Sequence, residues 1–250
     1  MAHGSTDPRS AAAVSSLFDR VRAQRPGLDV RLCYLDHTAP GVAETMEGLG
    51  RDGADEVVVL PALLTAAYHS KVDLPGVLAE GGPRWPRVRY ARALGPHPLL
   101  SAAVERRLAE AGAAPDPGTA LVLAAAGSSD PEANATVGAM AEELAGRAPW
   151  REAVPAYASA ASPGPGEAVA ALLEGGAERV AVATYLLAPG FFADRVRERS
   201  AAAGAAVVSE ALGDAKELAE VVLERYDTAA GAVFFEPPPA RRPPPPSTDA

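Results

Sequence analysis

Two histidines and one aspartate in the first third of the chain are the side chains best suited to do chemistry. They are His3, Asp36 and His69, and each stands at or just beyond the end of a strand-like run of residues. Neutral imidazole nitrogens are good ligands for first-row divalent metal ions, and a carboxylate can complete a three-point site or take up protons. The three residues therefore indicate a metal site or an acid–base centre where three strands end.

The chain contains an internal repeat with a constant offset of 123 residues. Residues 3–72 align without a gap with residues 126–195, and the Gly-Ser-x-Asp-Pro sequence of residues 4–8 recurs at residues 127–131. In two homologous halves, residues that maintain the scaffold are expected in both copies, whereas residues of a single active site are not. The repeat therefore separates scaffold residues from candidates for chemistry.

The three candidate residues lose their chemistry in the second copy. Each of them lies where a parallel α/β sheet places ligands, at the carboxyl end of a strand. Three coincident losses at one end of one half favour a shared functional site over three unrelated structural roles. The aligned pairs are His3 with Ala126, Asp36 with Ser159, and His69 with Phe192.

Each candidate also has a structural interpretation. An isolated loop histidine commonly is solvated or caps a helix, so capping or packing is the alternative for His3 and His69. The alternative for Asp36 is to cap the helix that follows it. His37 adjoins Asp36 and is a candidate substrate contact. His97 lies between two prolines, which predicts a position at the start of a helix.

The serine and aspartate of the first turn look structural, because both copies keep them. Ser5 and Asp7 recur as Ser128 and Asp130, where they are predicted to cap the helix that follows. This weakens a Ser-His-Asp hydrolase interpretation of residues 3–5, and no G-x-S-x-G sequence supports it. No G-x-G-x-x-G or P-loop sequence occurs either, so nucleotide binding has no support.

Strand-like and helix-like stretches alternate in both halves. Short apolar or β-branched runs predict strands at residues 29–35, 56–62, 87–93, 119–126, 153–158, 179–187 and 205–209. Helices are predicted near residues 10–25, 40–52, 97–112, 131–147, 165–175, 190–203 and 213–228. This alternation indicates an α/β fold with parallel sheets covered by helices on both faces. Such sheets bind ligands on the loops that follow their strands.

The repeat divides the chain into two domains and a tail. We predict an N-terminal domain at residues 1–114 with the metal site, a C-terminal domain at residues 115–230 with a degenerate site, and a disordered proline-rich tail at residues 231–250. A strand precedes Gly127, whereas only two residues precede His3. Because a central parallel strand cannot be omitted without losing ladder hydrogen bonds, we expect the native chain to start several residues upstream.

Composition narrows the class of protein. The 250 residues are 48% hydrophobic, enough to bury a core, and they contain no run of 18 apolar residues, so no membrane span is expected. A formal net charge of −9 argues against a nucleic-acid partner, which needs a basic face. Cys33 is the only cysteine, which excludes an internal disulfide. We therefore expect a cytoplasmic protein.

Three stretches together resemble the sirohydrochlorin chelatases. They are AHGSTDPR at residues 2–9, LDHTAP at residues 35–40 and LPALLTAAYHSKVDLP at residues 60–75. The combination of the AHGS turn with the later H-x-x-x-D-L-P loop carries the resemblance. It extends over nearly the whole chain except the tail, and the two-halved length is similar to that of the long bacterial form.

The resemblance implies an architecture, an activity and roles for residues. It implies two tandem, similar chelatase-like (Rossmann-like) domains whose parallel sheets face a cleft, in an enzyme of the lyase class. That enzyme would insert Fe²⁺ or Co²⁺, or else Ni²⁺, into sirohydrochlorin for sirohaem or cobalamin biosynthesis, as a monomer without an organic cofactor. His3 and His69 would be the metal pair, with Asp36 as a third catalytic residue where many members have glutamate. The residues implied to contact the tetrapyrrole are Ser5, Arg9, His37 and Lys71.

A second function uses the same residues. The chain would then be a non-catalytic carrier that binds a metal ion or a tetrapyrrole without turnover. The sequence does not choose among iron, cobalt and nickel, because two imidazoles follow the same order of affinity at any such site.

Overall fold

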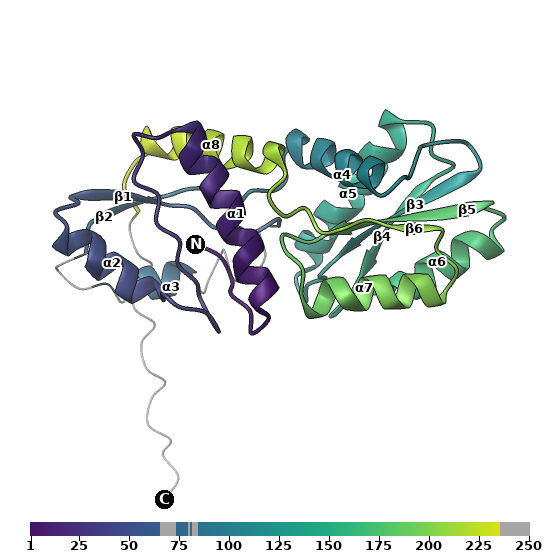
Figure 1. Ribbon diagram of the computed structural model, residues 1–250, viewed down its shortest axis with the longest axis horizontal. Helices are drawn as coiled ribbons and strands as arrows, with labels where there is room; N and C mark the ends of the chain where they lie inside the picture. Colours follow the sequence, from purple (N-terminus) through teal and green to yellow (C-terminus); the bar gives the residue numbers. More distant parts are fainter. Residues whose placement is uncertain (66–73, 80, 82–84, 236–250) are drawn as a thin grey trace, which may run out of the picture.

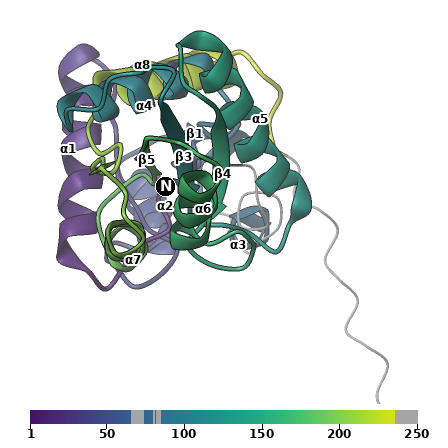
Figure 2. The same ribbon diagram turned by 90° about the vertical axis from the view of Figure 1, so that its right-hand side faces the viewer.

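The computed structural model describes residues 1–65, 74–79, 81 and 85–235, and it shows two α/β lobes side by side (Figure 1). Each lobe contains parallel strands, and helices lie on both sides of the strands when the molecule is seen from its end (Figure 2). This arrangement confirms the predicted fold class. No helix within the described ranges is long and apolar enough to cross a membrane.

The second lobe is built on four parallel strands in the order β4-β3-β5-β6. All seven residues of β3 are buried, as are six of the seven residues of β5. Strands covered on both faces need an apolar residue at nearly every position, which accounts for the continuous Ala, Val and Leu runs. The strands are β3 (Thr119–Ala125), β4 (Ala153–Tyr157), β5 (Arg179–Tyr185) and β6 (Val207–Val208). The helices are α5 (Pro131–Arg147), α6 (Pro165–Glu174) and α7 (Phe191–Ala202).

The first lobe repeats this layout with shorter strands. β1 (Glu56–Val59) pairs in parallel with β2 (Arg87–Tyr90). Residues 1–3 lie between two further extended segments: Ala2 N–H donates to Cys33 O at 2.9 Å, and Ala62 N–H donates to Met1 O at 2.7 Å. The helices are α1 (Pro8–Gln24), α2 (Val42–Arg51) and α3 (Leu74–Ala79).

The observed elements differ from the predicted ones at several points. The strands predicted at residues 56–62 and 87–93 end at Val59 and Tyr90. Residues 29–35 do not form a regular strand, because residues 1–3 offer only a few backbone partners and the pairing is confined to a bridge at Tyr34. β6 is limited to Val207–Val208, and the short helix α3 was not predicted. The expectation of an upstream start stays a prediction.

The repeat seen in the sequence is also a repeat of backbone geometry. Gly4 and Gly127 share a positive φ, of 95° and 85°, and His37 and Ala160 both have a φ of 59°. Asp7 and Asp130 cap α1 and α5 in the same way, each accepting from the backbone N–H two residues ahead. The serines correspond as well, because the Ser5 and Ser128 hydroxyls accept the backbone N–H groups of Asp7 and Asp130. The shared Ser and Asp residues therefore belong to the scaffold.

The last helix of each half crosses to the other lobe. α4 (Pro98–Glu110) begins at the capping residue His97, as predicted, and packs against β5 of the second lobe. α8 (Lys216–Ala230) returns to the first lobe, where it contacts α1, β1 and β2. Figure 1 shows α8 over the first lobe beside α1, and α4 over the second. The two copies follow one another in sequence, and the boundary between residues 114 and 115 stays a prediction, whereas the lobes exchange a helix in space.

A continuous hydrophobic core accompanies this exchange. It includes Leu17 of α1, Val104 of α4, Leu121 and Leu123 of β3, and Leu218 of α8, each at most 1% exposed. Burial of apolar surface from both halves in one core opposes separation of the lobes. The relative position of the two lobes, and of the loops between them, is therefore fixed by packing as well as by the linker.

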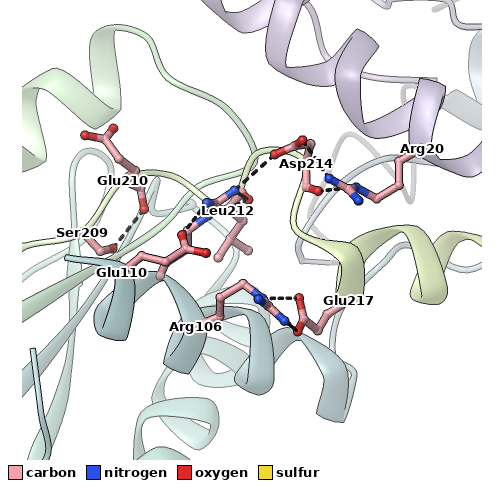
Figure 3. Close-up of polar contacts among 9 residues, drawn as sticks. Arg20, Arg106, Glu110, Ser209, Glu210, Leu212, Asp214 and Glu217 are labelled. Carbon is pink, nitrogen blue, oxygen red and sulfur yellow. Dashed lines mark hydrogen bonds and ion pairs between the residues drawn. The ribbon is translucent and has the colours of Figure 1, made fainter. Parts of the chain in front are cut away.

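Charged residues hold the junction between α4 and α8 (Figure 3). Arg106 of α4 makes a bidentate ion pair with Glu217 of α8, with an Nη2–Oε1 distance of 2.6 Å. Arg107 donates to Leu212 O at 2.7 Å, and Arg20 of α1 pairs with Asp214 at 3.1 Å. These contacts fasten the segment that carries the chain back from the second lobe to the first.

Glu217→Gln is expected to lower the free energy of unfolding by about 1–2 kcal/mol near neutral pH, because the partly buried Arg106 guanidinium exchanges a carboxylate partner for a neutral amide. The hydrogen bonds from Arg106 hold the pKa of Glu217 below its ordinary value of 4.5. The contribution of the pair is therefore fully present above pH 4.5 and is lost as the pH falls through the lowered pKa. Urea unfolding at pH 7 and pH 3 measures this, and an equal difference between variant and wild type at both pH values would contradict it.

The beginning of the tail is ordered. Phe235 N–H donates to Val88 O at 2.7 Å, and the Phe234 ring lies under the guanidinium groups of Arg87 and Arg89 at 4.2 and 4.0 Å. Disorder across all of residues 231–250 is thus wrong for residues 231–235, since two phenylalanines cover the edge strand β2. Residues 236–250 lie outside the described residues.

Candidate functional site

A cleft of about 870 Å³ lies between the two lobes. Its walls come from the loops that follow the strands of both sheets, where parallel sheets bind ligands. The first half contributes residues 2–6 and 62–65 among others, and the second half contributes residues 125–129 and 185–193. Among the described lining residues there is no Lys, Arg, Asp or Glu, so the polar groups are hydroxyls, one amide, imidazoles and backbone.

His3 is half-buried on the wall of this cleft. Its backbone is held on the sheet, because Asp36 N–H donates to His3 O at 2.9 Å. Its Nδ1 lies 3.3 Å from Gly4 O. The histidine therefore stands on a fixed strand end and presents an imidazole to the space between the lobes.

Gly4 is required by the close approach of two backbone segments. It has a φ of 95°, and a Cβ at this position would lie 1.7 Å from Asp36 O. Gly127 meets the same constraint in the second half, with 1.9 Å to Ser159 O. Only glycine fits where the φ is positive and the neighbouring carbonyl is this near. The turn after His3 is thus built tightly against the loop that begins at Asp36.

Asp36 and His37 are both exposed but face different surroundings. His37, in the left-handed region, belongs to the cleft lining, whereas Asp36 is not among the lining residues. Asp36 does not cap the following helix, because α2 begins after Gly41 and has no side-chain cap. The capping alternative for Asp36 is therefore wrong.

Ser5 lines the cleft and also supports the turn. Its hydroxyl accepts the Asp7 N–H at 3.1 Å, and its backbone N–H and C=O both bond the hydroxyl of Thr38, at 3.1 and 3.0 Å. In the second half, Asn134 makes the same pair of bonds to the backbone of Ser128. Sequence alignment does not show this equivalence, because Thr38 and Asn134 are not aligned with each other.

Arg9 is not among the described residues that line the large cleft. It pairs with Asp7 and with Asp194 of α7, both at 2.6 Å, and lines a separate pocket of about 170 Å³. Hydrogen bonds from Arg9 lower the pKa of Asp7, and those to Asp7 and Asp194 raise the pKa of Arg9. Arg9 thus joins the first helix of one lobe to α7 of the other.

Two predicted site residues, His69 and Lys71, lie outside the described residues. Within the described part of the chain, no three His, Cys, Asp or Glu side chains lie close enough together to hold a metal ion. Of the two predicted metal ligands, the described residues therefore include only His3. The partner from the third loop stays a prediction.

Two parallel-sheet lobes with a cleft at their strand ends are the architecture of the chelatase fold. A solved structure described as SirB from Bacillus subtilis with Fe³⁺ has this fold: it superposes with a TM-score of 0.75 at 22% identity, covering 92% of this chain and 94% of that one. The model of the CbiX family matches residues 1–111 and again residues 120–229. The chain belongs to the CbiX family, the sirohydrochlorin chelatases.

Two characterised relatives show how far the similarity extends. A sirohydrochlorin cobaltochelatase of Priestia megaterium is 29% identical over 174 residues, which cover 68% of this chain and 57% of that protein. A sirohydrochlorin ferrochelatase of Priestia megaterium is 26% identical over 201 residues, covering 78% of this chain and 74% of that protein. The chain therefore matches little more than half of the cobaltochelatase and about three quarters of the ferrochelatase.

Proposed function

We propose that this chain catalyses insertion of a divalent metal ion, Fe²⁺ or Co²⁺, into sirohydrochlorin. The observation that carries the proposal is His3 on the wall of an 870 Å³ cleft between the lobes of a CbiX-family protein. Cobaltochelatase and ferrochelatase relatives match with similar identity, so the choice of metal stays open to measurement. The metal ion is a substrate of the reaction, and the proposed reaction needs no organic cofactor.

The residues of the cleft suit the exchange that metallation requires. The ring loses two pyrrole N–H protons and forms bonds from its nitrogens to the metal ion, so the protein must hold the ion weakly and accept protons. His3 would bind the metal ion through its imidazole, whose Nδ1 lies 3.3 Å from Gly4 O. His69 would be the second ligand, and a site with two imidazoles releases its ion more readily than a closed cage of four ligands.

The charge of the cleft fits an anionic substrate in an acidic protein. The chain carries a formal net charge of −9, and sirohydrochlorin has eight carboxylate groups. The absence of Asp and Glu from the described lining keeps repulsion out of the site itself. Hydroxyl groups of Ser5, Thr6, Ser128 and Ser129 supply neutral donors there. Asp36, which adjoins the lining residue His37, would assist proton removal, and Lys71 would contact the carboxylates.

Metallation assays test the proposal directly. The purified chain is mixed with sirohydrochlorin and Fe²⁺, Co²⁺ or Ni²⁺ in separate reactions, and the absorption change is compared with the spontaneous rate. We expect acceleration with at least one of Fe²⁺ and Co²⁺, each added well below the concentration that drives spontaneous insertion. A rate equal to the spontaneous one for every metal would defeat the enzyme proposal. Tight binding of the tetrapyrrole without acceleration would instead identify a carrier.

A further inference from the structure

Two adjacent phenylalanines stand exposed where the second half lines the cleft. Phe191 is 70% exposed and Phe192 is 39% exposed, and both line the cleft at the start of α7. Their ring centroids are 5.6 Å apart with an interplanar angle of 62°, an edge-to-face arrangement. Large aromatic side chains left in water inside a cleft mark a surface that gains stability when a ligand covers it.

The start of α7 is held next to the turn that carries His3. Gly190 lies so close to that turn that a Cβ there would be 3.8 Å from the Asp7 Cβ and 3.9 Å from the Ser5 hydroxyl. On the other side of the aromatic pair, Asp194 forms an ion pair with Arg9 at 2.6 Å. The pair is therefore fixed at both ends against the first half.

The internal repeat aligns Phe192 with one of the two predicted metal ligands. Phe192 stands at the position that His69 occupies in the first copy, 123 residues earlier. Exchange of imidazole for a phenyl ring removes a metal ligand and leaves a flat apolar surface. At this position the second copy therefore has no metal-binding side chain. The phenyl ring of Phe192 lines the cleft instead.

We infer that Phe191 and Phe192 form the surface on which the macrocycle rests, with the second half binding the ring while the first half handles the metal. This inference rests on the proposed function. Since the two phenyl rings are strongly inclined, one of them can lie along the face of a flat tetrapyrrole while the other contacts its edge. Phe191, as the more exposed ring, takes the face. The carboxylate groups then lie around the rim, away from the phenyl rings.

Tetrapyrrole binding without metal separates this role from catalysis. Sirohydrochlorin is titrated against wild type, Phe191→Ala, Phe192→Ala and the double variant, with its absorption and fluorescence as the signal. We expect each single variant to raise the Kd about tenfold and the double variant more, while Co²⁺ binding to the protein alone is unchanged. In turnover, KM for sirohydrochlorin rises and kcat is largely kept. Phe191→Leu keeps apolar area without a ring and is expected to restore part of the affinity.

Phe234→Ala is the matched control, because it removes a phenyl ring that stacks on Arg87 and Arg89 rather than lining the cleft. Folding of every variant is checked by thermal unfolding.

If wild type metallates and the two alanine variants bind sirohydrochlorin as wild type does, the inference is overturned while the proposed function stands. If wild type does not metallate but the variants lose binding, the function fails and the inference holds for a carrier. Loss of self-association in the variants, with unchanged sirohydrochlorin binding, would assign the pair to protein contact and overturn the inference.

Discussion

His3→Ala is expected to lower the rate of sirohydrochlorin metallation by about 10²- to 10⁴-fold, the range for loss of a positioned acid–base or ligand group. The side chain is half-buried at the edge of the cleft, outside the hydrophobic cores, so its removal leaves little cavity. The melting temperature is expected to stay within about 2 °C of wild type, as for substitutions away from the core. The second copy already carries alanine at the aligned position, which shows that this turn accommodates the smaller side chain.

Rates, metal binding and melting curves should be measured together for this variant. His97→Asn is the control, because asparagine can still accept the Leu99 N–H at the start of α4 and the residue does not line the cleft. His69→Ala is expected to abolish metallation in the same way. A His3→Ala or His69→Ala protein with full activity would show that the site is assigned to the wrong residues.

Gly4→Ala is expected to destabilise the protein by about 3 kcal/mol or more and to abolish activity at the same time. The new methyl group cannot coexist with Asp36 O at 1.7 Å, so the turn must move away from the loop at Asp36. That movement displaces His3 from the cleft wall. Urea unfolding measures the loss of stability, and the metallation rate of the fraction still folded measures the displacement.

Gly127→Ala supplies the matched comparison, since its Cβ would meet Ser159 O at 1.9 Å in the same turn of the second half. Its loss of stability should be similar, but the protein that remains folded should keep more activity, because no metal ligand precedes Gly127. Equal stability of Gly4→Ala and wild type would be incompatible with the backbone geometry described above. Equal loss of activity per folded molecule in both variants would show that the effect does not depend on the histidine that precedes Gly4.

Local elements were accessible from the sequence because they depend on short-range patterns. Helices α5 and α6 begin at a proline that follows their capping residues, Asp130 and Gly164, and strands β3 and β5 are unbroken apolar runs. The prediction of a strand at residues 29–35 failed for a long-range reason. Its composition is strand-like, but the extent of a strand depends on the neighbour it pairs with, and residues 1–3 supply few hydrogen bonds.

For the site too, the sequence identified some residues but not the contacts that their side chains make. His3 was identified from the repeat and His37 from its place beside Asp36, and both line the cleft. The repeat did not show that Arg9 forms an ion pair with Asp194, a residue 185 positions away, and lines a pocket other than the large cleft. It also did not show that Thr38 and Asn134, at unaligned positions, perform the same task. Side-chain pairing of this kind depends on distances between segments, which residue types alone do not specify.

The sequence by itself determined the alternation of strands and helices, the two homologous copies and the turn that carries a histidine in one copy only. These are properties of short segments, whose apolar periodicity, capping residues and glycines act locally. Only the tertiary structure decided that α4 and α8 exchange lobes, that one core joins the halves, and that Phe191 and Phe192 line the same cleft as His3. The physical reason is that an amphipathic helix needs an apolar surface to cover but does not encode which sheet provides it.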